Sequence, residues 1–154
     1  ANMGHSRSRT ISKHGPDAGL LRFVICRLRE KAPSGRYYRG ATAAIIVFDV
    51  TKEGSWEKVE TWHQDLMRYA EPGVVIGVAG NKTDMPPAPG FDVEACRLAC
   101  AQWGASFHLT SAITGSGVNE LFLTVAKHAV RVHASYQAKG RLLEKTPHGN
   151  DFAC

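Results

Sequence analysis

The chain has 154 residues, 44% of them hydrophobic, which is enough for one compact domain and too little for two. Its apolar runs are far shorter than the roughly 20 residues that cross a bilayer, so we expect no membrane-spanning segment. The formal net charge of +5 arises in residues 1–40, which hold nine Lys or Arg against two acids. Because no aromatic or base-reading motif accompanies these basic residues, we expect no nucleic-acid binding.

Residues 1–36 are predicted to be a basic, largely disordered or non-homologous N-terminal segment. Residues 1–19 contain hardly any apolar side chains and cannot bury enough surface to become ordered. The chain begins at Ala1 without an initiator Met, and we expect a partial or processed sequence. No secretory signal precedes the domain, which favours a cytoplasmic protein whose four cysteines are thiols. Neither the cysteines nor the scattered histidines have metal-site spacing, so we expect no protein-made metal centre.

The first half of the domain reads as strand, helix, strand. Residues 43–50 are apolar at successive positions, as a strand covered on both faces requires. A helix is predicted from Trp56, with an inner face of Val59, Trp62, Leu66 and Tyr69. Residues 74–79 form a second buried strand that runs directly into Gly80-Asn81-Lys82-Thr83-Asp84.

The second half repeats the alternation. Asp92 is predicted to cap a helix whose inner face is Val93, Cys96, Cys100 and Trp103. A short strand over residues 106–110 leads into Ser111-Ala112. A last helix is predicted to reach His133, with an apolar stripe of Val118, Leu121, Phe122, Val125, Ala129 and Val132, and residues 134–154 are predicted to be a flexible tail.

Alternating strands and helices predict an α/β fold with a mostly parallel sheet covered by helices on both sides. Ligands bind such sheets at the carboxyl ends of the strands. Asn81 to Asp84 and Ser111-Ala112 both follow strands at that end. The sequence therefore predicts that these two loops converge on one crevice.

Asn81-Lys82-Thr83-Asp84 matches the Asn-Lys-x-Asp motif by which small GTPases recognise guanine, and Thr110-Ser111-Ala112 resembles their second base-binding loop. The segments 37–41 and 45–51 resemble the Rab branch. The chain is thus similar to a Rab-like small GTPase of the Ras superfamily over residues 37–133, the C-terminal part of such a domain. This implies a Ras-like, P-loop NTPase-type three-layer fold whose N-terminal strands are incomplete, and a role in vesicle trafficking.

One carboxylate, Asp84, can accept hydrogen bonds from both adjacent donors of guanine, its ring N–H and its amine. The resemblance implies that Asn81 ties the loops together, that Lys82 covers the base and that Ser111 orients Asp84. It also implies that the amide of Ala112 meets the guanine carbonyl. Ile113 stands where the family usually has Lys, so packing beside the base is expected to differ. Alternatively, Asn81 and Asp84 merely form an Asx-type turn after the strand.

The phosphate-binding motif Gly-x-x-x-x-Gly-Lys-Ser/Thr does not occur in the sequence, and no matching first switch is found. We interpret residues 17–23 as only a coincidental approximation of the catalytic Asp-x-Ala-Gly-Gln-Glu stretch. GTP or GDP is therefore expected to be held by base contacts only, Mg²⁺ binding is doubtful, and hydrolysis by this chain is improbable. Half a sheet would also leave an unpaired edge, unless residues 20–28 add a strand.

Three functions stay open: an incompletely recorded GTP-binding switch, a non-catalytic interaction scaffold, and a nonfunctional Rab fragment. The scaffold would use Tyr37, Tyr38 and Trp56 to bind partners such as Rab effectors or regulators. The terminal Cys154 is a candidate for prenylation, although the tail is no Cys-a-a-X box. Association with endomembranes would require that modification.

Overall fold

The computed structural model describes residues 23–27, 38 and 40–144. Within these residues four strands form one parallel sheet in the order β1-β2-β3-β4: β1 is Phe23–Arg27, β2 is Ala43–Asp49, β3 is Val75–Asn81 and β4 is Ser106–Thr110. Three helices connect or follow them: α1 is Ser55–Tyr69, α2 is Val93–Gln102 and α3 is Val118–Glu144.

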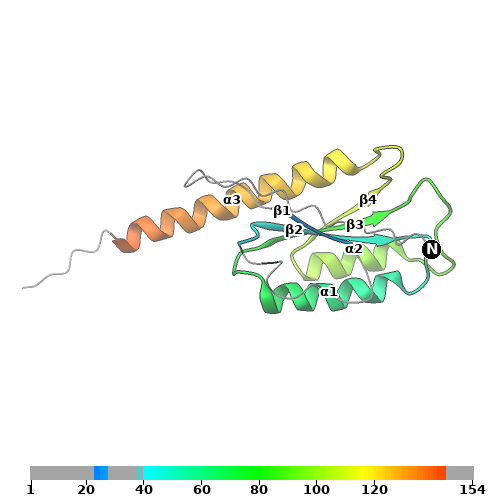
Figure 1. The fold of residues 1–154 in the computed structure, drawn as a ribbon, viewed down its shortest axis with the longest axis horizontal. Helices are drawn as coiled ribbons and strands as arrows, with labels where there is room; N and C mark the ends of the chain where they lie inside the picture. The colour runs from blue at the N-terminus through cyan, green and yellow to red at the C-terminus, as the bar shows by residue number, and fades with distance from the viewer. Residues whose placement is uncertain (1–22, 28–37, 39, 145–154) are drawn as a thin grey trace, which may run out of the picture.

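The sheet lies between two layers of helix, with α1 and α2 on one face and α3 on the other (Figure 1). Apolar side chains fill both interfaces because successive residues of β2 and β3 point to opposite faces. On the α1–α2 side, Ile46 and Val78 pack with Val59 and Leu66 of α1. On the α3 side, Ile45 and Ala79 pack with residues such as Val125. The predicted three-layer α/β fold with a parallel sheet is confirmed.

Strand register places the polar ends of three strands side by side. Asp49 of β2 pairs with Asn81 of β3, and Asn81 pairs with Thr110 of β4. All three are at or next to the carboxyl ends of their strands. The loops that follow β2, β3 and β4 therefore start from one level at one edge.

Local sequence signals account for the beginnings of two helices. Asp92 caps α2, since its Oδ1 accepts hydrogen bonds from the amides of Glu94 and Ala95 at 2.9 and 3.0 Å. Helix α1 begins after Gly54, which has a left-handed conformation and offers no side-chain cap. The predicted cap of α2 is thus confirmed.

The structure describes residues 23–27 of the segment 1–36, which was predicted to be basic and largely disordered or non-homologous. They form β1, which pairs with β2, as was left open for residues 20–28. Two other expectations need correction. Helix α3 continues past His133 to Glu144, so the tail does not begin at residue 134. Tyr69, assigned to the inner face of α1, is 49% exposed because it lies at the last residue of the helix.

The two cysteines of α2 face the core, as expected. Burial raises the pKa of the Cys96 thiol to about 11 and that of Cys100 to about 12.

Because the thiolate is the reactive form, we expect iodoacetamide at neutral pH to leave both side chains unmodified in the folded protein and to modify both after denaturation in urea. Peptide mass spectrometry checks this result, and stoichiometric alkylation of either cysteine in the native protein would contradict their burial.

Candidate functional site

The first loop of the site begins where β3 ends. Asn81 is the last residue of β3, and Lys82 takes a left-handed backbone conformation with φ of 75°. This conformation is energetically unfavourable for a residue other than glycine, so surrounding contacts must hold it. The amide of Met85 donates to the carbonyl of Lys82 at 3.0 Å, which closes the turn around Asp84.

The second loop follows β4 and is fixed from inside. Ser111 is buried, its amide donates to the carbonyl of Ser116 at 2.9 Å, and its own carbonyl accepts from Gly115 at 2.8 Å. Its hydroxyl also accepts from the amide of Thr114 at 3.2 Å. These bonds close residues 111–116 into a compact loop before α3 begins.

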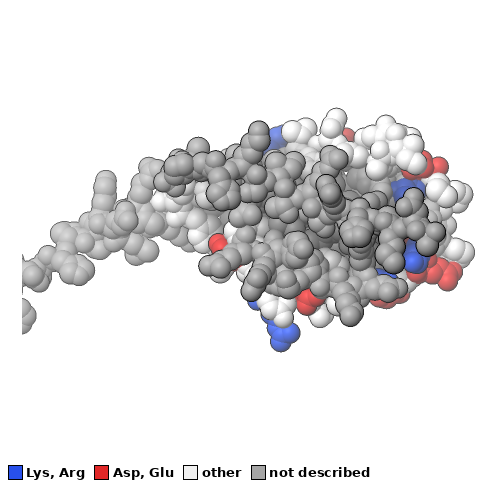
Figure 2. All heavy atoms as spheres, in the orientation of Figure 1, with Lys and Arg blue, Asp and Glu red and all other residues white. Residues whose placement is uncertain are grey.

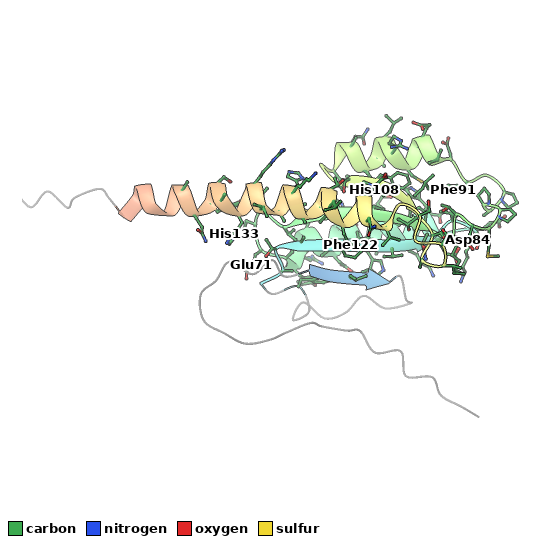
Figure 3. The ribbon with its side chains drawn as sticks, turned by 90° about the horizontal axis from the view of Figure 1, so that it is seen from above. Glu71, Asp84, Phe91, His108, Phe122 and His133 are labelled. Carbon is green, nitrogen blue, oxygen red and sulfur yellow. The ribbon has the colours of Figure 1, made fainter. Side chains whose placement is uncertain are left out.

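Hydrogen bonds join the two loops, although they are far apart in the sequence. The hydroxyl of Ser111 donates to Oδ1 of Asp84 at 2.5 Å, and the amide of Ala112 donates to Oδ1 of Asn81 at 3.0 Å. The amide of Thr83 donates to the carbonyl of Thr110 at 3.2 Å. The structure therefore brings together the residues predicted to form one crevice, and Figure 3 shows Asp84 at the opposite end of the sheet from Glu71.

One detail differs from the predicted arrangement. The amide of Ala112 was expected to point at a ligand carbonyl, yet here it donates to the side chain of Asn81. The hydroxyl of Thr110 points to the same Asn81 oxygen at 3.3 Å. A ligand carbonyl at this position would have to share or replace the bond from Ala112.

Asp49 is a residue of the site that was not predicted from the sequence. Its Oδ2 lies 2.5 Å from Nζ of Lys82, while its Oδ1 accepts from the amide and hydroxyl of Thr51 at 3.0 and 2.6 Å. Partial burial alone would raise the pKa of the Asp49 carboxyl, but the bonds from Lys82 and Thr51 and the positive charge of Lys82 leave it lowered. The ion pair holds the Lys82 side chain over the end of β2 and supports its left-handed backbone. The signal available in the sequence was an acid at the carboxyl end of the neighbouring strand.

We expect Asp49→Asn to release the Lys82 side chain and to lower the affinity for any ligand held by this loop by about threefold to tenfold. The free energy of unfolding should change by less than about 1 kcal/mol, because the ion pair is partly exposed. Since the pKa of Asp49 is lowered, its contribution to stability is complete above the ordinary value of 3.8 and is lost as the pH falls below it. Ligand titration and urea unfolding of the two proteins measure both effects. Equal ligand affinity in both proteins would show that Lys82 needs no such support.

The remaining predicted residues differ in how exposed they are. Ile113 is 84% exposed, so it is not enclosed in the crevice. Met85, which was not among the predicted residues, is 51% exposed. Tyr38 is fully buried in the core and cannot belong to an exposed partner-binding face, which corrects that prediction. Trp56 is half-buried against the same core. Tyr37 and Cys154 lie outside the described residues.

A hollow of about 320 Å³ adjoins the first loop at Asn81 and Lys82 but is not lined by Asp84 or by the second loop. The charged residues Asp49, Lys52, Glu53 and Lys58 also line it. In residues 23–27, 38 and 40–144, no three His, Cys, Asp or Glu side chains are grouped as a metal site would need. No helix in this part of the chain combines the length and the apolar character needed to cross a membrane. The crevice thus offers a carboxylate, an amide side chain, backbone amides and ammonium groups.

Comparison with known proteins relates these residues to one family. Residues 30–131 match the sequence model of the Ras family. The Ras-related protein Rab5 of Nicotiana tabacum is 38% identical over 111 residues, which cover 72% of this chain and 56% of that protein. RABF2b of Arabidopsis thaliana is 39% identical over 107 residues, covering 70% and 54%, and Rab-5A of Dictyostelium discoideum is 37% identical over 106 residues, covering 69% and 53%. The chain spans about half the length of the curated relatives it matches.

Proposed function

Because this chain belongs to the Ras family and is Rab-like within it, we propose that it binds guanine nucleotides, GDP and GTP, through Asn81 to Asp84 and Ser111-Ala112. The hydrogen bond from Ser111 to Asp84 carries the proposal, because it fixes an acceptor between the two loops. A carboxylate has about four acceptor positions, so this bond leaves room for both donors of guanine. Adenine has no such pair of donors and would leave these remaining acceptor positions of the carboxylate unfilled.

The surroundings of Asp84 support a site for a base. Asn81 joins the loops, the Lys82 stem lies beside them, and Ser111 holds the carboxylate. In this proposal Ile113 and Met85 provide apolar contacts at the rim and do not confer guanine specificity. The cellular role we propose is that of a Rab-like protein in vesicle trafficking on endomembranes, with Rab effectors or regulators as partners.

Hydrolysis and Mg²⁺ are not part of the proposal. The sequence contains no Gly-x-x-x-x-Gly-Lys-Ser/Thr motif, whose amides, lysine and hydroxyl would hold phosphates and Mg²⁺. The acids beside the crevice do not fit Mg²⁺ either, since Asp49 is paired with Lys82 and Asp84 is bonded to Ser111. We therefore derive no step through a metal ion.

Titration of the full chain with GDP carrying a fluorescent group on its ribose tests the proposal. We expect saturable binding that unlabelled GDP, GTP and guanosine reverse and that ATP and adenosine do not. Guanosine should compete almost as well as GTP, because the contacts are to the base. Equal competition by ATP, or no saturation at millimolar nucleotide, would refute guanine recognition.

A further inference from the structure

A second hollow lies on the α1–α2 side of the sheet, and we call it the Trp56 groove. It has a volume of about 400 Å³ and lies between the loop after β2, the first turn of α1 and the segment that leads into α2. Its walls include Trp56, Phe91 and Ala95. Figure 3 shows Phe91 at the same end of the molecule as Asp84, but the groove shares no residue with the base-reading loops.

The aromatic wall of the groove is fixed by the core beneath it. The Trp56 ring stacks on Trp103, with centroids 5.9 Å apart and an angle of 9° between the planes, and it meets Phe48 edge to face at 5.4 Å. Phe91 also packs against Phe48, at 6.1 Å. Because these contacts already hold both rings in the free protein, a ligand would meet a preformed apolar wall and would not have to order it.

The rim of the groove carries three carboxylates, Glu53, Glu57 and Asp92, against one ammonium group, Lys52. Among residues 40–144 ion pairs join Lys82 to Asp49 and Arg97 to Glu94, and neither includes the rim carboxylates. Asp92 accepts hydrogen bonds only from backbone amides of α2. The rim therefore carries more negative than positive charge. Figure 2 shows acidic and basic side chains close together at the end of the molecule where the strands' carboxyl ends lie.

We propose that the Trp56 groove binds an extended basic peptide segment of another protein, with aliphatic side chains on the aromatic wall and Lys or Arg at the acidic rim. Apolar walls give such a site contact area, and the rim charges select cations and repel acidic peptides. A guanidinium or ammonium group beside Trp56 gains a further attraction to the ring. The groove shares residues 52–55 with the hollow beside Lys82, but it includes none of the base-reading residues. It retains Trp56 as a partner-binding residue although Tyr38 is buried.

An octapeptide of alternating Arg and Leu, carrying a fluorophore, is the probe for the full chain. We expect saturable binding that weakens with added salt, chemical-shift changes at the Trp56 indole and the Phe91 amide, and no binding of the corresponding Glu and Leu peptide. A peptide of Arg and Ser should bind at least about tenfold more weakly, because it lacks the apolar side chains. These results should be the same with and without guanine nucleotide.

Two variants address the groove directly. The double variant Glu53→Gln, Glu57→Gln removes two exposed rim charges and should weaken the Arg and Leu peptide at least about threefold, with a smaller dependence on salt. Ala95→Lys places bulk and positive charge in the groove and should abolish binding. Matched controls are Glu60→Gln on α1 and Leu98→Lys on α2, both exposed and outside the groove, which should bind as the native chain does.

Three outcomes would overturn the proposal. The first is equal binding by Ala95→Lys and the native chain, since that would place the peptide elsewhere. The second is preference for the acidic peptide. The third is tighter binding by a peptide of residues 1–22, which would make the basic N-terminal segment of this chain the occupant in place of another protein.

Discussion

Asp84→Ala is expected to weaken guanine-nucleotide binding at least about 100-fold, because each hydrogen bond to a charged acceptor contributes roughly 1.5–3 kcal/mol and the variant loses two. Fluorescent GDP titration measures the loss. The substitution also removes the partner of the Ser111 hydroxyl, so part of the effect could come from a loosened loop.

Asp84→Asn separates these two causes. Its amide oxygen can still accept from Ser111, but its NH₂ group is a donor and would face the donors of guanine. We expect a loss of guanine binding similar to that of Asp84→Ala, with a free energy of unfolding within about 1 kcal/mol of the native value. Native affinity in Asp84→Asn would show that the carboxylate does not read the base.

Gly117→Ala is expected to destabilise the protein by about 3 kcal/mol or more and to disorder the second base loop. Gly117 has a left-handed φ of 69°, and a Cβ atom there would overlap the backbone carbonyl oxygen of Leu109. That carbonyl belongs to β4 and cannot move without disturbing the strand that leads into Ser111. Urea unfolding measures the loss of stability, and it should be accompanied by loss of nucleotide binding.

Gly115→Ala is the matched control for that prediction. Gly115 also has a left-handed φ, of 80°, but a Cβ atom there would meet nothing within 4 Å. The cost should therefore be only the backbone strain of about 1–2 kcal/mol, clearly below that of Gly117→Ala. Equal destabilisation by the two variants would mean that the contact with Leu109 is unimportant.

Much of the fold could be predicted because residues 43–48 and 74–79 contain no polar side chain. Such runs require cover on both faces, and this requirement alone indicates a parallel sheet between helices. The cap at Asp92 was equally readable, since a short acidic side chain before an apolar helical pattern satisfies free amides. These features depend on local sequence.

Other features depend on contacts that the sequence does not display. Residues Phe23–Arg27 are a short, mostly apolar run in a basic segment, and they form β1 by pairing with β2. Tyr38 was expected to be a surface aromatic, but it is fully buried in the core on the α1–α2 side of the sheet. Helix α3 continues to Glu144 although its apolar stripe fades near His133.

In the candidate site, too, some features follow from the local sequence and others depend on tertiary contacts. Motif matching identified Asp84 and Ser111, and the parallel topology implied that their loops meet. It did not identify Asp49, because the ion pair with Lys82 depends on the register of β2 against β3. It also did not indicate that Ala112 already donates to Asn81 in the free protein.

The most direct test of base recognition by the two joined loops is an NMR titration of the isotopically labelled chain with guanosine and, separately, with adenosine. Guanosine should shift the amide signals of Thr83, Asp84 and Ala112 in a saturable way, and adenosine should leave them unchanged. Signals that respond equally to both nucleosides, or guanosine shifts confined to residues outside the two loops, would contradict the assignment of this site.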